Sequence, residues 1–538
     1  MPHIIDAATL RAWLNDGQSL ALFDVREHGE HGEGHPFLAV PLPYSRLELE
    51  LNRLAPRRAE RIVLFDAGDD GDAVALRAAH HLATLGYCKV SVLGGGVRAW
   101  AAAGYTLFKG VNVPSKTFGE LVEQLQHTPH LSAVDLAARR AAGEPFVLID
   151  GRTVEEHRKM TIPGALSCPN GELALRLPAL VPNPNTPVVV HCAGRTRSII
   201  GAQTLIDLGL PNPVLALENG TQGWYLAGYA LEHGSQRTAA QAPSAHTLAV
   251  ARERSARLLE RFGLPALSAS QAQRWLDDNT RTTYLFDIRG AEEFANCTID
   301  GALHAPGGQL VQATDRYIGV RGSRVIVFDD DGVRAPVVAS WLHQLGFKSA
   351  VLADGIHAAL KVPARPASLP AHGLPVLDAS LLRALLSENP SATRIDLRES
   401  AEYEHGHARG AAWSIRPRLL ARLEALGVAR DQPVVLIANE PEVAIVAGKD
   451  LLDAGYRHVY RTDNGHRTWQ AAGLPEDTGP LPREERIDYL FFVHDRHEGN
   501  ADAARAYLAW ETGLIAQCAP DELAVFRIPA PVTQAKAA

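Results

Sequence analysis

One pattern occurs four times along the chain, and this internal repeat limits the folds that the sequence can adopt. In each copy an apolar segment ends in Asp-x-Arg, and a second apolar segment has just ended 42 residues after the Asp. A single spacing held in four copies indicates a duplicated fold. The pairs are Asp24 with Arg26, Asp150 with Arg152, Asp287 with Arg289 and Asp396 with Arg398, and the residues 42 positions after each Asp are Asp66, Cys192, Asp329 and Ala438.

The segments between these landmarks predict an α/β fold. After its second apolar segment each copy has a helical stretch that stops at a glycine, then a third apolar segment and a glycine turn. Strands that alternate with helices at this spacing are typical of a parallel sheet flanked by helices. We therefore expect four α/β modules, at residues 1–110 (module 1), 128–235 (module 2), 264–361 (module 3) and 374–476 (module 4), and a helical tail over residues 480–538.

Composition and charge argue against several classes of function. A net charge of −8 over 538 residues gives no reason to expect nucleic acid or an anionic membrane as a partner. The N-terminal residues lack the basic and apolar regions of a signal peptide, and no apolar run reaches membrane-spanning length. Five scattered cysteines without a C-x-x-C pair argue against a zinc site or a disulfide framework. We expect a cytoplasmic protein that uses neither a metal nor a cofactor.

Cys192 is the candidate catalytic residue. It follows the apolar segment Val188 to His191 and precedes a short loop with one glycine and two arginines, which opens a helix. Loop amides at the start of a helix form an anion-binding nest, and the helix dipole adds partial positive charge. A thiol in this position is expected to have a lowered pKa and to act as a nucleophile. Most lone cysteines are small buried hydrophobes, but the basic loop argues against that interpretation here.

The loop resembles the active-site loop of rhodanese-type sulfurtransferases, which begins with the cysteine and runs for six residues, here Cys192 to Arg197, with Ser198 starting the helix. Many rhodanese loops have glycine at the fourth position, whereas Gly194 is third. Asp-x-Arg and a glycine-rich turn before Trp are further features of that family. The resemblance implies four tandem rhodanese-like domains, each a parallel sheet flanked by helices. It also implies a thiosulfate sulfurtransferase activity through a persulfide on Cys192.

The implied reaction moves a sulfane sulfur from thiosulfate, or a similar small anionic donor, to cyanide or a thiol. Cys192 is then catalytic. The pair formed by Asp150 and Arg152 has a counterpart in each of the three modules that lack a cysteine at the position of Cys192. We therefore interpret Asp150 and Arg152 as structural support. The residues expected to bind the substrate are Ala193, Gly194, Arg195, Thr196, Arg197 and Ser198. Arg195 and Arg197 would attract the donor anion and stabilise the leaving sulfite.

The other three modules are expected to be inactive, because Asp66, Asp329 and Ala438 stand at the cysteine position. Modules 1 and 2 would form one tandem pair, in which the active loop faces the inactive partner, and modules 3 and 4 a second pair. The remaining cysteines, Cys88, Cys168, Cys297 and Cys518, are interpreted as buried hydrophobes rather than relay thiols.

Two alternative functions stay open at this point. A cysteine phosphatase or arsenate reductase would use the same thiolate, but the phosphatase signature places Arg where this chain has Ser198. A scaffold with vestigial rhodanese modules would explain three modules without cysteine, although the intact basic loop at Cys192 argues against it. The physiological donor and acceptor, the oligomeric state and the role of the tail do not follow from the sequence.

Overall fold

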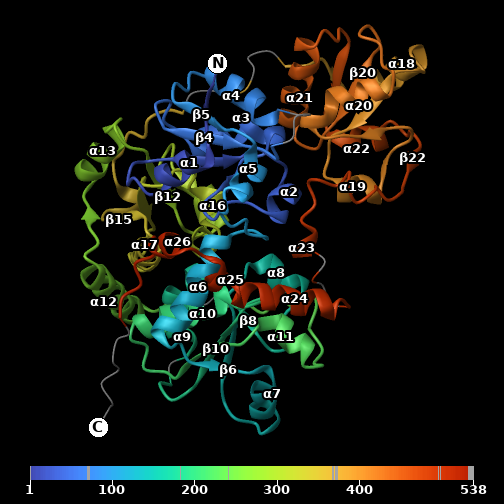
Figure 1. Ribbon diagram of the computed structural model, residues 1–538. Coiled ribbons are helices and arrows are strands. Elements are labelled where there is room, and N and C mark those ends of the chain that lie inside the picture. The colour runs from blue at the N-terminus through green and yellow to red at the C-terminus, as the bar shows by residue number, and fades with distance from the viewer. Residues whose placement is uncertain are drawn as a thin grey trace. The chain divides into compact units, whose positions relative to one another are not determined.

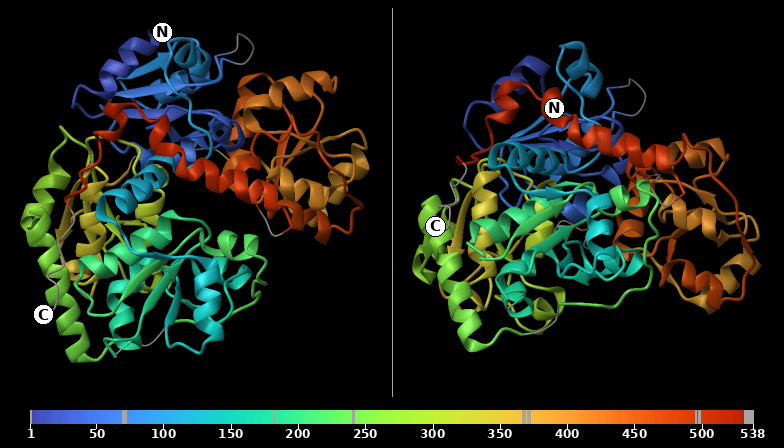
Figure 2. Two further views of the ribbon diagram at one scale, coloured as in Figure 1. Left: turned by 60° about the horizontal axis from the view of Figure 1, so that its bottom comes forward. Right: turned by 90° about the horizontal axis from the view of Figure 1, so that it is seen from below.

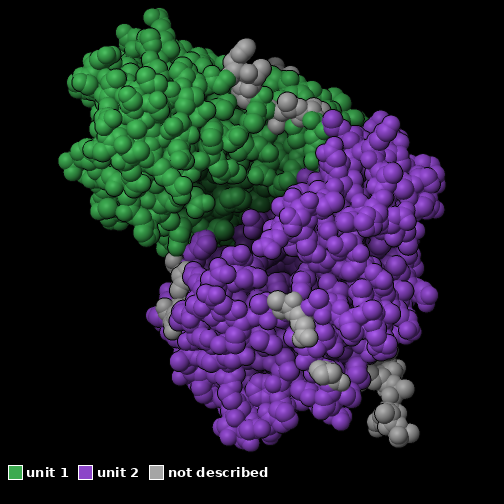
Figure 3. Space-filling view, turned by 180° about the vertical axis from the view of Figure 1, so that it is seen from behind, with its two compact units in different colours: residues 1–12, 21–110, 365–491 green, residues 13–20, 111–364, 492–538 purple. Residues whose placement is uncertain are grey.

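The computed structural model (Figures 1 and 2) describes residues 2–68, 73–181, 183–239, 242–365, 369, 373–494, 496 and 499–530. The chain divides into two compact units, which Figure 3 colours separately. Modules 1 and 4 make up most of unit 1, which comprises residues 1–12, 21–110 and 365–491. Modules 2 and 3 belong to unit 2, which comprises residues 13–20, 111–364 and 492–538.

Each module contains a parallel sheet, as the sequence predicted. The sheet has five strands, and the strand order is the same in all four modules. The first strand of each module lies at one edge, and the second apolar segment forms a central strand, where both neighbours protect its backbone. The strands of unit 1 are β1 (His3–Ile5), β2 (Ala21–Asp24), β3 (Val40–Pro41), β4 (Ile62–Phe65) and β5 (Val90–Leu93) in module 1, and β16 (Val376–Leu377), β17 (Thr393–Asp396), β19 (Ala412–Trp413), β20 (Val434–Ile437) and β21 (Val459–Thr462) in module 4, with the antiparallel pair β18 (His407–Ala408) and β22 (Glu476–Asp477).

The sheets of unit 2 follow the same order. Their central strands are buried throughout β9 and from Val325 to Phe328 of β14, and most of these residues are β-branched or aromatic, as suits a strand covered on both faces. The strands are β6 (His130–Leu131), β7 (Val147–Asp150), β8 (Leu166–Ser167), β9 (Val188–His191) and β10 (Val214–Leu217) in module 2, and β11 (Ala266–Leu267), β12 (Thr283–Asp287), β13 (Leu303–His304), β14 (Arg324–Phe328) and β15 (Lys348–Leu352) in module 3.

Helices flank all four sheets. The helix after the central strand stops before a glycine with positive φ in every module, at Gly86, Gly209, Gly346 and Gly455. The helices of unit 1 include α2 (His28–Glu33), α3 (Leu47–Leu54), α4 (Val74–Thr84), α5 (Gly96–Ala102), α18 (Ala379–Glu388), α19 (Ser400–His405), α20 (Leu419–Ala425), α21 (Pro441–Asp453) and α22 (Gly465–Ala471), and α1 spans Ala7–Leu14. Those of unit 2 include α6 (Val113–Gln126), α7 (Ala133–Ala141), α8 (Val154–Lys159), α9 (Leu173–Leu180), α10 (Thr196–Asp207), α11 (Gly220–Leu226), α12 (Ala245–Phe262), α13 (Ala269–Asp277), α14 (Ala291–Asn296), α15 (Gly307–Gln312), α16 (Thr314–Tyr317) and α17 (Arg334–Gln344).

The buried Asp-x-Arg pair has the same geometry in every module. In module 2 the Nε and Nη2 atoms of Arg152 donate to the two carboxylate oxygens of Asp150 at 2.9 and 2.7 Å, and Nη2 also donates to the carbonyl of Met160. The pairs in the other modules repeat both contacts, and the carbonyl always lies eight residues after the arginine. The pair therefore fastens the end of one strand to the segment that follows it.

The modules do not pair in the order of the sequence, so the expected pairs of modules 1 with 2 and 3 with 4 are wrong. In unit 2 Arg334 of module 3 donates to Glu172 of module 2 at 2.8 Å. In unit 1 Arg416 of module 4 donates to Glu48 of module 1 at 2.9 Å. The spacing of residues within a repeat defines each module, but it does not predict which surface of one module packs against which other module. This explains the error.

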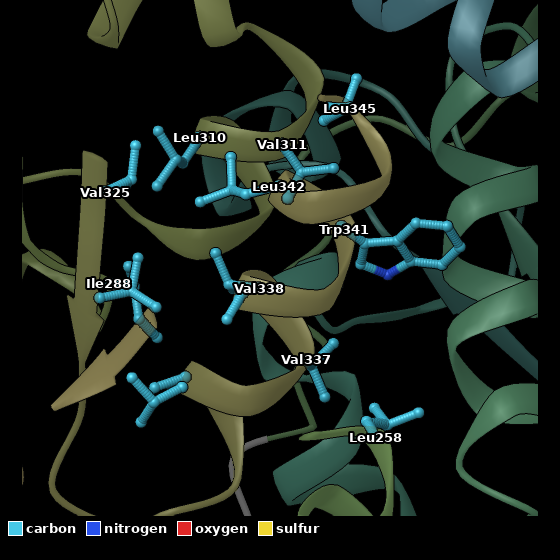
Figure 4. Close-up of a cluster of buried hydrophobic side chains, with 14 of the residues drawn as sticks. Leu258, Ile288, Leu310, Val311, Val325, Val337, Val338, Trp341, Leu342 and Leu345 are labelled. Atoms are coloured by element: carbon cyan, nitrogen blue, oxygen red, sulfur yellow. The ribbon is translucent and has the colours of Figure 1, made fainter. Parts of the chain in front are cut away.

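Modules 2 and 3 share a hydrophobic core around α17. Figure 4 shows Val338 and Leu342 on the side of α17 that faces Ile288 and Val325, whereas Trp341 points away from them. The indole Nε1 of Trp341 donates to Thr204 Oγ1 in α10 at 2.8 Å, and the ring packs edge-on against Phe118 of α6. One helix of module 3 thus buries apolar surface on both sides.

The tail after module 4 begins with α23 (Phe491–His494). It continues in unit 2 with α24 (Ala501–Thr512), α25 (Leu514–Gln517) and α26 (Pro520–Leu523). The described part of the helical tail expected over residues 480–538 therefore consists of separate helices rather than one long helix. Helix α24 packs against α6 and α11 (Figure 1). Within the described ranges, no helix is both long and apolar enough to cross a membrane.

We predict that Trp341→Ala destabilises unit 2 by about 3–5 kcal/mol, because it removes a buried aromatic side chain that joins two modules. The measurement is urea denaturation followed by circular dichroism. The control is Val134→Ala in α7, where the side chain is 58% exposed and the expected change is within about 0.5 kcal/mol. An equal effect of the two substitutions would contradict a shared core of modules 2 and 3.

Candidate active site

Cys192 lies at the carboxyl end of β9, directly before the loop that leads into α10. Its side chain is 2% exposed, and its Sγ accepts a hydrogen bond from Ser198 Oγ at 3.2 Å. Helix α10 begins at Thr196, two residues earlier than the expected start at Ser198. Arg197 and Ser198 therefore belong to the first helical turn, where the unpaired amides and the helix dipole favour negative charge.

The glycine turn before α11 holds the backbone of the cysteine loop. The N–H of Thr221 donates to the carbonyl of Cys192 at 2.8 Å, and the N–H of Gln222 donates to the carbonyl of Ala193 at 3.1 Å. Gly220 has φ of 51°, and a Cβ there would lie 2.1 Å from the Cys192 carbonyl oxygen, so only glycine fits. Because both peptides are trans, the N–H groups of Ala193 and Gly194 point away from α11.

Modules 1 and 3 place a carboxylate where module 2 has the thiol. Asp66 accepts from the N–H groups of Gly68 and Ala75 at 3.0 and 2.9 Å. Asp329 accepts from the N–H groups of Gly332 and Ala335 at 2.9 and 2.8 Å. In both of these modules, one loop amide and one amide at the start of the following helix bind an acceptor group at the cysteine position. Module 4 has only the methyl group of Ala438 there.

Arg195 is paired with carboxylates of α6. Its Nε and Nη2 donate to the two oxygens of Glu120 at 2.8 and 3.0 Å, and Nη2 also donates to Glu123. Burial raises the pKa of Glu120 to about 7, and Arg195 offsets only part of this effect. The positive charge of Arg195 is thus already compensated by neighbouring side chains. The sequence analysis missed this partner helix, which lies between the expected modules 1 and 2.

Arg197 makes a second, bidentate ion pair. Its Nη1 and Nη2 donate to the carboxylate of Glu156 at 2.6 and 2.7 Å, and Asn170 Nδ2 donates to its backbone carbonyl at 2.8 Å. Burial alone would raise the pKa of Glu156, but the charge of Arg197 outweighs it and holds that pKa at about 2. This arrangement fixes the guanidinium in the first turn of α10.

Asp150 is the centre of a buried network behind the loop. Besides Arg152, its Oδ2 is bound by His157 Nδ1 at 3.0 Å and by Thr161 Oγ1 at 2.9 Å. His191 Nε2 lies 3.8 Å from the same oxygen. Burial lowers the pKa of His191 to about 4, so this imidazole is neutral near pH 7. The Asp150 network supports the end of β9 without supplying a second nucleophile.

The tail contributes a side chain to the site. Glu511 of α24 is 1% exposed, and its Oε1 accepts from Thr196 Oγ1 and from Lys116 Nζ, both at 3.0 Å. A Cβ on Gly194 would lie only 2.8 Å from Glu511 Oε2, so the carboxylate lies directly beside this loop position. The partner of Thr196 was not predictable, because 315 residues separate it from Glu511.

A pocket opens beside the first turn of α10, on the side of module 3. Thr196, Arg197 and Ile200 line it from α10, with Phe118 from α6 and Val311 and Trp341 from module 3. Thr196 and Arg197 thus lie beside module 3, whereas Cys192 itself does not line this pocket. Among the described residues, no cluster of three or more His, Cys, Asp or Glu side chains is placed to bind a metal ion.

The other cysteines lie outside the loop. Cys168 is buried, and burial raises the pKa of its thiol. Burial likewise raises the pKa of Cys518 to about 12. Cys88 and Cys297 are exposed and Cys518 is only partly buried, so of the four cysteines interpreted as buried hydrophobes only Cys168 is buried. Cys192 alone lies at the start of a helix-opening loop with two arginines.

Two curated proteins match parts of the chain. A tRNA uridine(34) hydroxylase of Pectobacterium carotovorum is 27% identical over 158 residues, which are 28% of this chain and 41% of that protein. The HTH-type transcriptional regulator Rv0324 of Mycobacterium tuberculosis is 32% identical over 105 residues, which are 20% of this chain and 45% of that protein. The chain thus spans less than half the length of each of these curated relatives.

A crystal structure titled thiosulfate sulfurtransferase, from Pseudomonas aeruginosa, is similar over almost the whole chain. It is 40% identical, covers 98% of this chain and 99% of its own, and superposes with a TM-score of 0.89. The sequence model of the rhodanese-like domain matches four segments, residues 6–103, 132–227, 268–361 and 378–472. The chain therefore belongs to the rhodanese family, as a member with four rhodanese-like domains.

Proposed function

We propose that this protein is a sulfurtransferase that takes a sulfane sulfur from thiosulfate or a similar anionic donor and carries it on Cys192. The observation that supports it most directly is the position of the thiol at the start of an amide-rich loop, where modules 1 and 3 bind a carboxylate. A loop that accepts an anionic group at this position suits a persulfide, whose terminal sulfur carries negative charge.

The proposed reaction has two steps. In the first, the thiolate of Cys192 attacks the outer sulfur of thiosulfate or a similar donor, the S–S bond of the donor breaks, and sulfite leaves with the electron pair. In the second, cyanide or a thiol attacks the terminal sulfur of the persulfide, and Cys192 leaves as thiolate. The enzyme passes through a covalent intermediate, which gives ping-pong kinetics.

Loop residues have separate roles in this proposal. The amides of Ala193 to Arg197 stabilise the terminal sulfur, and Ser198 Oγ donates to Cys192 Sγ. Arg197 stabilises the leaving sulfite. Arg195 holds α6 against the loop, because its guanidinium is shared by Glu120 and Glu123. Asp150 and Arg152 keep the strand end in place.

We predict that Cys192→Ser abolishes sulfur transfer from thiosulfate to cyanide while the circular dichroism spectrum stays that of the wild type, because a hydroxyl cannot form a persulfide. Cys297→Ser, which removes an exposed thiol, is the control and should keep full activity. Wild-type protein should not hydrolyse an aryl phosphate. Substantial transfer by Cys192→Ser, or efficient phosphate hydrolysis, would refute the proposed chemistry.

Arg195→Met is expected to destabilise the protein by about 3–5 kcal/mol, because it leaves the buried Glu120 without its cation. The difference in the free energy of unfolding between wild type and variant should grow between pH 6 and pH 8. A buried carboxyl with a raised pKa lowers the stability of the fold as the pH rises, until the pH passes that pKa. In the wild type the pKa of Glu120 is raised to about 7, so this decline ends near pH 7. Without Arg195 the pKa of Glu120 rises further, so the variant continues to lose stability above pH 7.

Urea denaturation at both pH values measures this effect. Glu120→Gln combined with Arg195→Met should restore part of the stability, since the buried charge is gone. The control is Arg257→Met, in which a side chain that is 57% exposed is replaced. If Arg195→Met costs no more than this control, Arg195 does not hold α6.

Arg197→Ala should lower kcat/KM for thiosulfate by about tenfold to a hundredfold, as for loss of one charge-stabilising group. Alkylation of Cys192 by neutral iodoacetamide should slow much less. The control is Arg158→Ala, an exposed arginine of α8. Equal losses in the two reactions would mean that Arg197 acts on the cysteine or the fold rather than on the anion.

A further inference from the structure

The tail helix α24 brings a buried negative charge to the active loop. Glu511 touches the loop twice, through the hydrogen bond from Thr196 and through the close approach of Oε2 to Gly194. Oε2 has no hydrogen-bond partner among the described residues. Burial alone would raise the pKa of Glu511, but the charge of Lys116 outweighs it and the pKa is lowered, so the carboxylate is ionised near neutral pH.

Cations and carboxylates around the loop are equal in number, although Glu120, with its pKa raised by burial to about 7, is only partly ionised near neutral pH. The cations are Arg195 and Arg197 of the loop region, Lys116 of α6 and Arg496 of the tail, and the carboxylates are Glu120, Glu123, Glu156 and Glu511. Arg195 and Arg197 alone would favour a dianion over a monoanion. With so little excess of positive charge on the side chains, the second negative charge of a dianion gains little attraction from them, and its desolvation still costs free energy.

We propose that Glu511 is a specificity-determining residue of the Cys192 site, and that its charge selects sulfur donors with one negative charge over dianions such as thiosulfate. This inference rests on the proposed function and narrows the class of donor. The preferred donors are singly charged sulfane compounds, such as thiosulfonates or organic persulfides. In either case the Cys192 thiolate takes the terminal sulfur, and the rest of the donor leaves with the electron pair of the broken S–S bond.

The test compares two donors of similar shape, thiosulfate and methanethiosulfonate, in which a methyl group replaces one charged oxygen. With the wild type and each variant, kcat/KM is measured for both donors with cyanide as acceptor. Glu511→Gln should raise the ratio of thiosulfate to methanethiosulfonate by about tenfold, because a nearby unit charge acts more strongly on the dianion.

Lys116→Met removes the cation that Glu511 pairs with, and should lower the same ratio. Opposite shifts separate a charge effect from a structural one, since damage to the loop would weaken both donors alike in both variants. If Glu511→Gln does not fold, Lys116→Met decides the outcome by itself. The control is Asp502→Asn, which removes a fully solvated carboxylate from the same helix and should leave the ratio unchanged.

An unchanged ratio in the folded Glu511→Gln variant, or a ratio that does not fall in Lys116→Met, would overturn the inference. The proposed function is judged separately, by mass spectrometry of wild-type protein after treatment with each donor. If neither donor leaves an extra sulfur on Cys192, the sulfur-transfer proposal itself has failed. If both donors leave an extra sulfur on Cys192 while the ratio of kcat/KM values is the same in the wild type and the variants, only the role of Glu511 is refuted.

Discussion

The buried Asp–Arg ion pair at the end of the second strand is the interaction on which each module depends. Two parallel N–H···O bonds join the residues, and the arginine reaches on to a backbone carbonyl eight residues later. A buried charge without its partner costs several kcal/mol, so neither residue can be lost alone. The pair is retained in the three modules that have no cysteine at the position of Cys192, which fits a role in the fold rather than in the chemistry.

The residue directly after the central strand differs between the modules: it is Asp66, Cys192, Asp329 or Ala438. A glycine turn approaches the carbonyl of that residue in all four modules, through Gly96, Gly220, Gly355 and Gly465. The turn thus fixes the backbone whatever side chain is present. In modules 1 and 3 the aspartate at this position accepts hydrogen bonds from amides of its own module, whereas module 2 has the Cys192 thiol there.

The repeat allowed the four sheets, their strand ends and the position of Cys192 to be predicted from the sequence, because spacing and alternation are local properties. The pairing of modules, the ion pairs of Arg195 and the contact between Thr196 and Glu511 could not be predicted. Each of these contacts joins elements that lie far apart in the chain, and the spacing of residues within one repeat does not predict such contacts. The helical pattern of α6, with apolar Phe118 and Val122 on one face, was a signal that the sequence analysis left unused.

The central claim is that one thiol in the chain carries sulfur, and peptide mapping tests it most directly. The protein is treated with a modest excess of thiosulfate, trapped with an alkylating agent, digested and analysed by mass spectrometry. The account predicts one extra sulfur per chain, on the peptide that contains Cys192. Extra sulfur that arrives first on Cys168, or on two peptides in comparable yield, would contradict it.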